Sequence, residues 1–346
     1  MNISETMNKI PTPFRRLVEK LTLLLNDDGN DRYSNEEIIS VPVTACLQNK
    51  SISYTAKYPD DSIIRKRLSE VLTVKKIRDM IKKDRPRVRE KVTLAFDEHD
   101  ERFYGDKNTE GVIGVQPKEG TSWAFSYLAA KIITRDKEYI VDILPLYDRN
   151  LEVHAMEMMN ELVKEYRIGL ILIDSGFRDT DLFELIVRSN IHFITKLRTS
   201  KNLREKDIPC NTAIEYSSIY EKGTYNSVGK DLFVYRLRNK KGEEYYLISD
   251  KKDEAATIKD EYRSRWGIET GFREVNRMEI KTTTKNPTIR YFFYVISVLM
   301  YNIWIGIRSR FPGSVIRLDA IRDILLKAIN TFMKIRGNIL QIMGAS

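Results

Sequence analysis

One short run of residues limits the folds open to this chain more than any other. Ile168-Gly-Leu-Ile-Leu-Ile173 contains no polar side chain, and Asp174 follows it directly. A strand with one exposed face alternates apolar and polar residues, whereas a continuously apolar strand is buried on both faces, as in a sheet covered by helices. The run therefore predicts an α/β structure with a carboxylate at the carboxyl end of a buried strand.

The segments around this strand follow a definite order. Strands are predicted at 92–97, 122–134, 138–145, 168–173 and 191–197, and helices at 150–166 and 180–190. The first three strands form an antiparallel meander, and the order β-β-β-α-β-α-β is what a ribonuclease H-like core requires. In that core the first strand is central and the fourth lies parallel beside it. Asp97, at the end of the first strand, is therefore expected to be a neighbour of Asp174.

Two regions lie outside this core. The sequence of residues 1–90 predicts short helices, one of which has a capping box at Ser34-Asn-Glu-Glu37. Pro86 makes it unfavourable for the last of these helices to continue. Residues 199–250 predict a β-rich insertion with a hairpin around Gly242. The expected domains are a small all-α region at 1–90 and a ribonuclease H-like domain at 91–346 that carries the insertion.

Basic residues are concentrated in the helical region. The whole chain carries a net charge of +9, and from Arg65 to Lys91 there are twelve Lys or Arg against four Asp or Glu. This imbalance favours a phosphate-binding surface over a solvated helix face. A compact helical unit with a basic second half is typical of helix-turn-helix DNA-binding modules, although no such signature can be assigned to particular residues. The candidate DNA-binding residues are Arg65, Lys66, Arg67, Lys75, Lys76 and Arg78.

Several other classes of protein are disfavoured. The two cysteines have no partner motif and the three histidines match no zinc spacing, so disulfides and structural zinc are not expected. His99 is interpreted as a polar loop residue rather than a base. The apolar run 291–307 is shorter than the roughly 20 residues that span a bilayer, so it predicts a buried core helix. Without a secretory signal at residues 1–13, the expected location is a reducing cytoplasm.

A helix is predicted over Tyr262-Arg-Ser-Arg-Trp-Gly-Ile-Glu-Thr-Gly-Phe-Arg-Glu-Val-Asn276. At about 100° per residue, five polar side chains would fall within an arc of roughly 80°. They are Tyr262, Arg265, Glu269, Arg273 and Asn276. This polar stripe would border an apolar one, so its charges would lie beside the core. Arg and Glu at this spacing also suit an ordinary half-buried ion pair, which is the structural alternative.

Tyr262, Arg265 and Glu269 reproduce the first part of a known signature, Tyr-x2-Arg-x3-Glu-x6-Lys. On these residues the chain resembles the DDE transposases of the insertion-sequence-four superfamily of bacteria and archaea. The resemblance covers residues 92 to about 310, and Asp97-Glu-His-Asp-Glu-Arg-Phe-Tyr-Gly105 is similar to a halobacterial branch of that group. Asn276 stands where the family has lysine, which leaves a phosphate contact at that position open.

The resemblance implies a triad of Asp97, Asp174 and Glu269 that is both catalytic and metal-binding. Two Mg²⁺ or Mn²⁺ ions per active site would support phosphodiester hydrolysis and strand transfer during DNA transposition. Tyr262, Arg265, Arg273 and Asn276 would be DNA-binding residues, since a guanidinium matches phosphate oxygens in two places.

The implied partners are double-stranded DNA, as terminal inverted repeats and target, and a second copy of the chain in a homodimeric active complex. The implied location is the prokaryotic cytoplasm, at the nucleoid. Two other functions stay open: a catalytically silent DNA-binding protein descended from a transposase, for which Asn276 is the hint, and a ribonuclease H-like nuclease that cuts without joining.

Overall fold

The computed structural model describes residues 12–25, 32–56, 59–134, 137–174, 176–177, 180–198, 200–206, 208–219, 231–239, 241–311 and 316–342. They divide into two compact units. The sheet unit consists of residues 86–104 and 112–270. The helical unit consists of the described residues up to Arg85, the segment 105–111, and the described residues from Gly271 onward.

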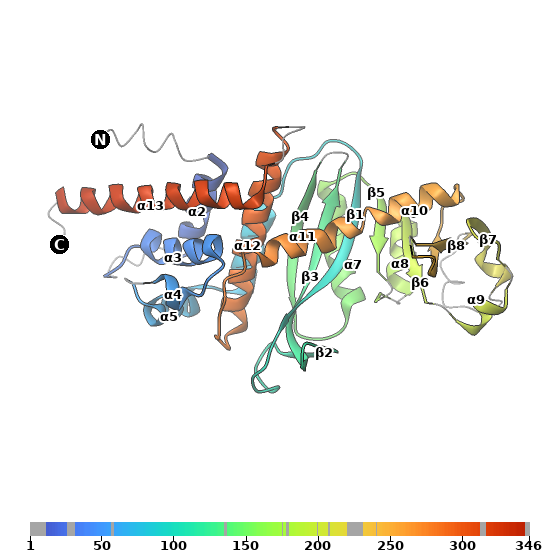
Figure 1. Cartoon of the computed structure of the whole chain (residues 1–346), viewed down its shortest axis with the longest axis horizontal. Coiled ribbons are helices and arrows are strands. Elements are labelled where there is room, and N and C mark those ends of the chain that lie inside the picture. Colours follow the sequence, from blue (N-terminus) through green and yellow to red (C-terminus); the bar gives the residue numbers. More distant parts are fainter. Residues whose placement is uncertain are drawn as a thin grey trace. The chain divides into compact units, whose positions relative to one another are not determined.

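A mixed sheet of nine strands forms the sheet unit (Figure 1). The strands are β1 (Val92–Arg102), β2 (Ile113–Lys118), β3 (Thr121–Ile133), β4 (Glu138–Leu146), β5 (Ile168–Ile173), β6 (His192–Leu197), β7 (Thr212–Glu215), β8 (Phe233–Arg238) and β9 (Glu244–Ser249). Their order across the sheet is β2-β3-β1-β5-β6-β9-β8-β7, and β4 also pairs with β3. β1 is antiparallel to β3 and parallel to β5. The predicted α/β architecture, with the first strand central, is confirmed.

The beginning of the sheet differs from the prediction in two ways. β1 continues to Arg102, so Asp97 lies inside the strand and not at its end, and the prediction of His99 as a loop residue is wrong. β2 lies between the first two predicted strands, in a segment for which no strand was predicted. Only Ile113 and Val115 of β2 are buried, and so short an apolar alternation carries almost no strand signal.

The predicted insertion does not form a separate layer. Its hairpin, β8 and β9, is found at the predicted place with Gly242 at a φ of 81°, a backbone conformation that glycine adopts readily. β9 pairs antiparallel with β6, so the hairpin and β7 extend the central sheet. The helix that follows, α10 (Ala255–Arg263), contacts β6 and β8, so it lies close to the β8–β9 hairpin.

The core of the sheet unit lies under two helices, α7 (Leu151–Glu165) and α8 (Thr180–Arg188). Leu94, Phe96, Ile171 and Ile173 face this core together with buried side chains of both helices, among them Met158, Met159 and Phe183. Side chains alternate between the faces of a strand, so Asp97 points away from this core. The apolar packing on one face thus holds the strands that present the carboxylate on the other.

The helical unit is built around α12 (Pro287–Arg308). The other helices are α2 (Thr12–Leu23), α3 (Asn35–Gln48), α4 (Ile52–Thr55), α5 (Asp61–Val71), α6 (Val74–Lys83) and α13 (Leu318–Ile342). α12 contacts α2, α3, α5 and α6, and α3 also contacts α13. The structure thus groups the helices after Gly271 with the amino-terminal ones, a division different from the predicted boundary at 90 and 91.

Two predictions within the helical unit are confirmed. Glu37 Oε2 accepts from the Ser34 amide at 2.7 Å and the Glu37 amide donates to Ser34 Oγ at 3.3 Å, which is the predicted capping box. α12 is the one helix, within the described part of the chain, that is long and apolar enough to cross a membrane. Of its most apolar window, 89% is buried inside the protein, as predicted for a core helix.

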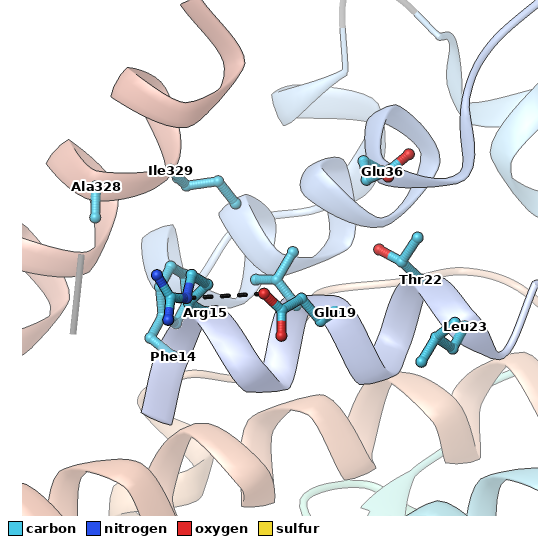
Figure 2. Close-up of a pocket in the computed structure, with 9 residues that line it drawn as sticks. Phe14, Arg15, Glu19, Thr22, Leu23, Glu36, Ala328 and Ile329 are labelled. Atoms are coloured by element: carbon cyan, nitrogen blue, oxygen red, sulfur yellow. Dashed lines mark ion pairs between the residues drawn. The ribbon is translucent and has the colours of Figure 1, made fainter. Parts of the chain in front are cut away.

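A groove of about 460 Å³ opens between α2 and α13 (Figure 2). Phe14, Val18 and Ile329 line it with apolar surface, and an ion pair between Arg15 and Glu19 at 3.7 Å runs along α2 beside it. None of these lining residues belongs to the candidate active site described below.

Candidate active site

The helix predicted around Glu269 is interrupted. α10 ends at Arg263 and α11 (Trp266–Asn276) begins after a turn at Ser264 and Arg265. In this turn the Arg265 amide donates to the Tyr262 carbonyl at 3.0 Å, a bond between residues three apart, whereas an α-helix joins residues four apart. The prediction of one continuous helix from Tyr262 to Asn276 is therefore wrong, because the turn at Ser264 and Arg265 divides it into α10 and α11.

The turn places Arg265 among all three predicted acids. Its Nη2 donates to Glu269 Oε1 at 2.7 Å and lies 3.9 Å from Asp174 Oδ1, and its Nη1 lies 3.7 Å from Asp97 Oδ2. The side chain of Arg265 is buried, so these interactions are only weakly screened by solvent. Three carboxylates from separate elements thus converge on one guanidinium.

The strand register explains how two of the acids meet. Ala95 of β1 is paired with Leu172 of β5, so Asp97 and Asp174, each two residues further, emerge on the same face. Exposure rises outward across the triad, from 17% for the Asp97 side chain to 40% for Asp174 and 52% for Glu269. Asp97 therefore forms the buried end of the site and Glu269 the open end.

Burial and crowding change the acidity of Asp97. Burial raises the pKa of this carboxyl to about 7; the charges of Asp174 and Glu269 raise it too, while Arg265 and the amide of Glu98 lower it. Glu98 N donates to Asp97 Oδ1 at 3.0 Å. A single guanidinium among three carboxylates leaves an excess of negative charge, which a further cation would relieve.

Several buried donors at the site have no hydrogen-bond partner among the described residues. They are Nε and Nη1 of Arg265 and the hydroxyl of Tyr262. The Tyr262 ring centroid lies 5.5 Å from the guanidinium carbon, and burial raises the pKa of the Tyr262 hydroxyl above its usual value. Buried donors without partners are unfavourable, so an acceptor bound at this place would stabilise these groups.

Both residues border a cavity of about 910 Å³ that also reaches Asp174 and Glu269. Basic side chains from β6, the β8–β9 turn and α10 line its other walls: Lys196, Lys241, Lys259 and Arg263. Three acids, Glu243, Glu244 and Asp260, lie among these basic side chains, so the walls carry charges of both signs. The cavity is wide enough for part of a polymeric substrate, and its basic side chains can bind an anion whose reacting bond lies at Asp174 and Glu269.

The donor set suits a hard divalent cation. Carboxylate oxygens are the ligands that Mg²⁺ and Mn²⁺ prefer, and the excess negative charge favours such an ion. In the described part of the chain, no three acidic, histidine or cysteine side chains form a ready-made metal-binding group. The three acids approach Arg265 instead of one another. Their carboxylate oxygens are suitable metal ligands, but in this structure they surround a guanidinium.

The remaining predicted site residues lie in the helical unit. Arg273 and Asn276 are exposed on the second half of α11. Lys66 and Lys75 are exposed on α5 and α6, whereas Arg78 is only 8% exposed and cannot offer an open phosphate-binding surface as predicted.

The other three basic candidates are partly occupied by contacts within the protein. Arg65 makes two hydrogen bonds to Asp61, at 2.6 and 2.9 Å. Arg67 donates to the Leu25 carbonyl at 3.4 Å and Lys76 to the Val71 carbonyl at 3.0 Å.

One pair of residues near the site was missed at the sequence level. Lys131 of β3 is fully buried and donates to the Glu138 carboxylate and to the carbonyl of Gly267 at the start of α11. A usable signal existed, since Lys131 interrupts the apolar run Leu128-Ala-Ala-Lys-Ile-Ile133. A lysine inside a buried strand must find a partner, because burying an isolated charge is very unfavourable.

Comparison with known proteins gives two findings. Residues 138–303 match the family described as the transposase DDE domain. Among solved structures, the chain is similar to the piggyBac transposase in a cryo-EM structure of its synaptic complex with hairpin DNA, at 16% sequence identity and a TM-score of 0.60, with 96% of this chain and 79% of that chain covered. At this identity the likeness concerns the fold. A search of curated protein sequences finds no match.

Proposed function

We propose that this chain is a DNA transposase of the DDE type, which binds the ends of an insertion sequence and catalyses phosphodiester hydrolysis and strand transfer there. The observation that carries the proposal is the convergence of Asp97, Asp174 and Glu269 on Arg265. An ion pair that serves stability alone needs one acid per base, whereas a triad with excess negative charge suits metal-dependent chemistry. Membership of the insertion-sequence-four superfamily and its halobacterial branch belongs to the same proposal.

Asp97, Asp174 and Glu269 would hold the divalent ions, for which we propose Mg²⁺ or Mn²⁺ in a pair. When bound, such ions activate a water or a 3′-hydroxyl and stabilise the leaving oxygen. Asp97 lies deepest, and its pKa of about 7 in the absence of metal means that ion binding must displace a proton from part of the molecules at neutral pH. Arg265 holds the acids apart before binding and keeps the site from repelling a DNA strand.

The unpaired donors support a contact with DNA phosphates at the site. Arg265 and Tyr262 line the cavity and carry buried N–H and O–H groups without hydrogen-bond partners among the described residues, for which a phosphodiester oxygen would be a suitable acceptor. The guanidinium can satisfy one phosphate with two parallel donors. We infer that Arg265 organises the acids and also binds the strand that is cut, with Tyr262 beside it.

In the helical unit, the exposed Lys66 and Lys75, with Arg65, Arg67 and Lys76 around them, would contact the duplex outside the cut. We propose element terminal inverted repeats and target DNA as the two substrates. Because two ends must be joined to one target, the active complex would contain at least two copies of the chain. The prokaryotic cytoplasm, at the nucleoid, would be the place of action.

The decisive experiment uses the full chain with duplexes that carry the inverted repeats flanking its reading frame. We expect cleavage at the repeat ends in Mg²⁺ or Mn²⁺ and joining of the freed 3′ ends to a second duplex. Asp97→Asn, Asp174→Asn and Glu269→Gln should each abolish cleavage while DNA binding persists, because the acids would hold metal and not DNA.

Asp231→Asn changes an exposed acid of the same unit and should leave every step unaffected. Binding without cleavage by the unaltered chain would indicate a silent DNA-binding protein. Cleavage without joining would indicate a nuclease.

A further inference from the structure

Lys131 is the most deeply buried basic side chain near the candidate site. None of its surface is exposed, and two of its partners belong to the sheet unit: the Glu138 carboxylate at the start of β4 and the Gly267 carbonyl in the first turn of α11. An ammonium has three donors, and one of them here meets a main-chain carbonyl of the helix that carries Glu269. This bond ties β3 to α11.

The sheet register places Lys131 on the same face as the acids. Lys131 is paired with Ala95, and Ala129 is paired with Asp97, across the antiparallel β1–β3 ladder. Side chains of directly paired residues lie on the same face of a sheet, and residues two apart on a strand share a face. Lys131 therefore projects from the acid-bearing face, next to Asp97 in the adjoining row, toward the first turn of α11.

Gly267 is the point at which α11 meets this pair. A Cβ atom built there would lie 2.5 and 2.6 Å from the two carboxylate oxygens of Glu138, far inside any real contact. The absence of a side chain lets Glu138 approach the helix while it holds Lys131. Gly267 also stands midway between Arg265 and Glu269, so a shift of its backbone moves both residues relative to Asp97 and Asp174.

We propose that Lys131 is a positioning residue for the acid triad: with Glu138 it clamps the first turn of α11 at Gly267, and this clamp sets the distances from Arg265 and Glu269 to the two strand aspartates. Its consequence for catalysis rests on the proposed function. The clamp itself does not, because it is a property of the free protein. Lys131 touches no reacting group and acts only through the backbone of α11.

A purely stabilising ion pair would behave differently. Removing one member of a buried ion pair destabilises a protein strongly when the remaining charge stays buried, and less when that charge can reach water. Glu138 can do so, since 37% of its side chain is exposed. Lys131→Met should therefore leave the protein folded and free the helix start, whereas loss of a mere stability contact would act on the whole sheet.

The first test measures amide hydrogen exchange in the metal-free, DNA-free full chain. Lys131→Met should speed exchange in peptides covering 264–270 by about tenfold or more, with no change in α7 and α8, because local opening needs only the loss of local contacts. Gly267→Ala should do the same by pushing Glu138 away. This direction is informative, since alanine otherwise favours a helix over glycine and would slow exchange.

Matched controls come from the same unit. Lys118→Met removes an exposed lysine of β2, and Gly114→Ala adds a Cβ that meets Trp123 at an ordinary 3.6 Å. Neither should change exchange at 264–270. The double variant Lys131→Met/Gly267→Ala should open the segment no further than either single change, because both break one clamp.

The second test measures single-turnover DNA cleavage. Lys131→Met, Glu138→Gln and Gly267→Ala should each slow cleavage by on the order of 10²-fold at unchanged DNA affinity, as for a small misplacement of catalytic groups. Unchanged exchange at 264–270, exchange raised throughout the sheet, or local opening with full cleavage would each overturn the proposal. If the unaltered chain does not cleave DNA, the proposed function fails, and the exchange result still decides whether the clamp exists. Should Lys131→Met not fold, Gly267→Ala and Glu138→Gln give the decision.

Discussion

Arg265 in the sheet unit and Arg290 in the helical unit are equally buried, each 5% exposed, yet their surroundings differ. Arg290, near the start of α12, donates from Nε to the Thr284 carbonyl at 2.6 Å and from Nη2 to the Thr282 carbonyl at 3.4 Å. Arg265 faces three carboxylates, and its Nε and Nη1 lack hydrogen-bond partners among the described residues. One guanidinium fixes a loop to a helix, and the other stands between acids with donors to spare.

The difference shows which buried charges belong to folding and which to function. A cation whose donors meet main-chain carbonyls contributes to stability in the free protein, because those carbonyls would otherwise be unsatisfied. A cation with unused donors is unfavourable to bury and gains its partners only when a ligand arrives. The same distinction can be drawn for exposed cations.

The largest effect is expected from Arg265→Lys. Lysine keeps the positive charge but loses the fork that reaches Glu269, Asp174 and Asp97 together. Single-turnover cleavage should fall by about 10²- to 10³-fold, as when one preorganised donor is removed from an active site, while the midpoint of urea unfolding stays nearly constant. A variant that unfolds more easily but cleaves normally would place Arg265 with the stabilising arginines.

Arg290→Lys should give the opposite pattern. The ammonium cannot reach both Thr284 and Thr282 carbonyls, so the free energy of unfolding should drop by about 2 kcal/mol, the scale of hydrogen bonds from a charged donor. Urea unfolding measures the loss, and cleavage per folded molecule below the transition should be unchanged. A loss of cleavage without a loss of stability would break the comparison between the two arginines.

The sequence predicts the parts of this structure whose patterns are local. The apolar strand 168–173, the hairpin around Gly242 and the capping box at Ser34 were all found in place, because period, turn residues and caps act over a few positions. The proximity of Asp97 and Asp174 was also predicted, because the order of the strands in the sheet determines which residues of different strands lie side by side.

What the sequence could not predict depends on contacts between distant segments. The turn between α10 and α11 breaks a good helical pattern because Arg265 is directed toward acids on β1 and after β5, and no periodicity within 262–276 encodes that. The clamp of Lys131 on Gly267 joins residues far apart in sequence. The grouping of α12 with the amino-terminal helices likewise depends on which apolar faces match.

A smaller effect should separate two cations of α6. Lys75 is exposed, whereas Arg78 is buried. If α6 borders DNA, Lys75→Gln should weaken duplex binding equally for all sequences and reduce the slope of log affinity against log salt by about 0.9, the contribution of one neutralised phosphate. Arg78→Gln should leave that slope unchanged. Fluorescence anisotropy titrations of the full chain between low and moderate salt give both values; equal slopes for all three proteins would remove α6 from the DNA surface.

The smallest expected effect concerns Asn276, where the signature has lysine. Arg273 and Arg277 stand near it, and the structure distinguishes them. Arg277 binds Glu274 at 2.9 Å and Asp319 at 2.7 Å, while Arg273 is exposed and makes no ion pair in the described part of the chain. By the distinction above, Arg277 serves the helical unit and Arg273 is open to a ligand.

Arg273→Ala should therefore weaken end binding or cleavage by about 1 kcal/mol, an effect that shrinks as salt rises, and Arg277→Ala should act on stability instead. Asn276→Lys should add little if Arg273 already supplies the charge, and should restore binding when combined with Arg273→Ala, because both side chains point outward from the same half of α11. Binding assays at two salt concentrations compare the four variants. If Arg273→Ala and Asn276→Lys both change nothing, this half of α11 does not meet DNA, and the distinction between occupied and open cations fails for exposed residues even where it holds for Arg265.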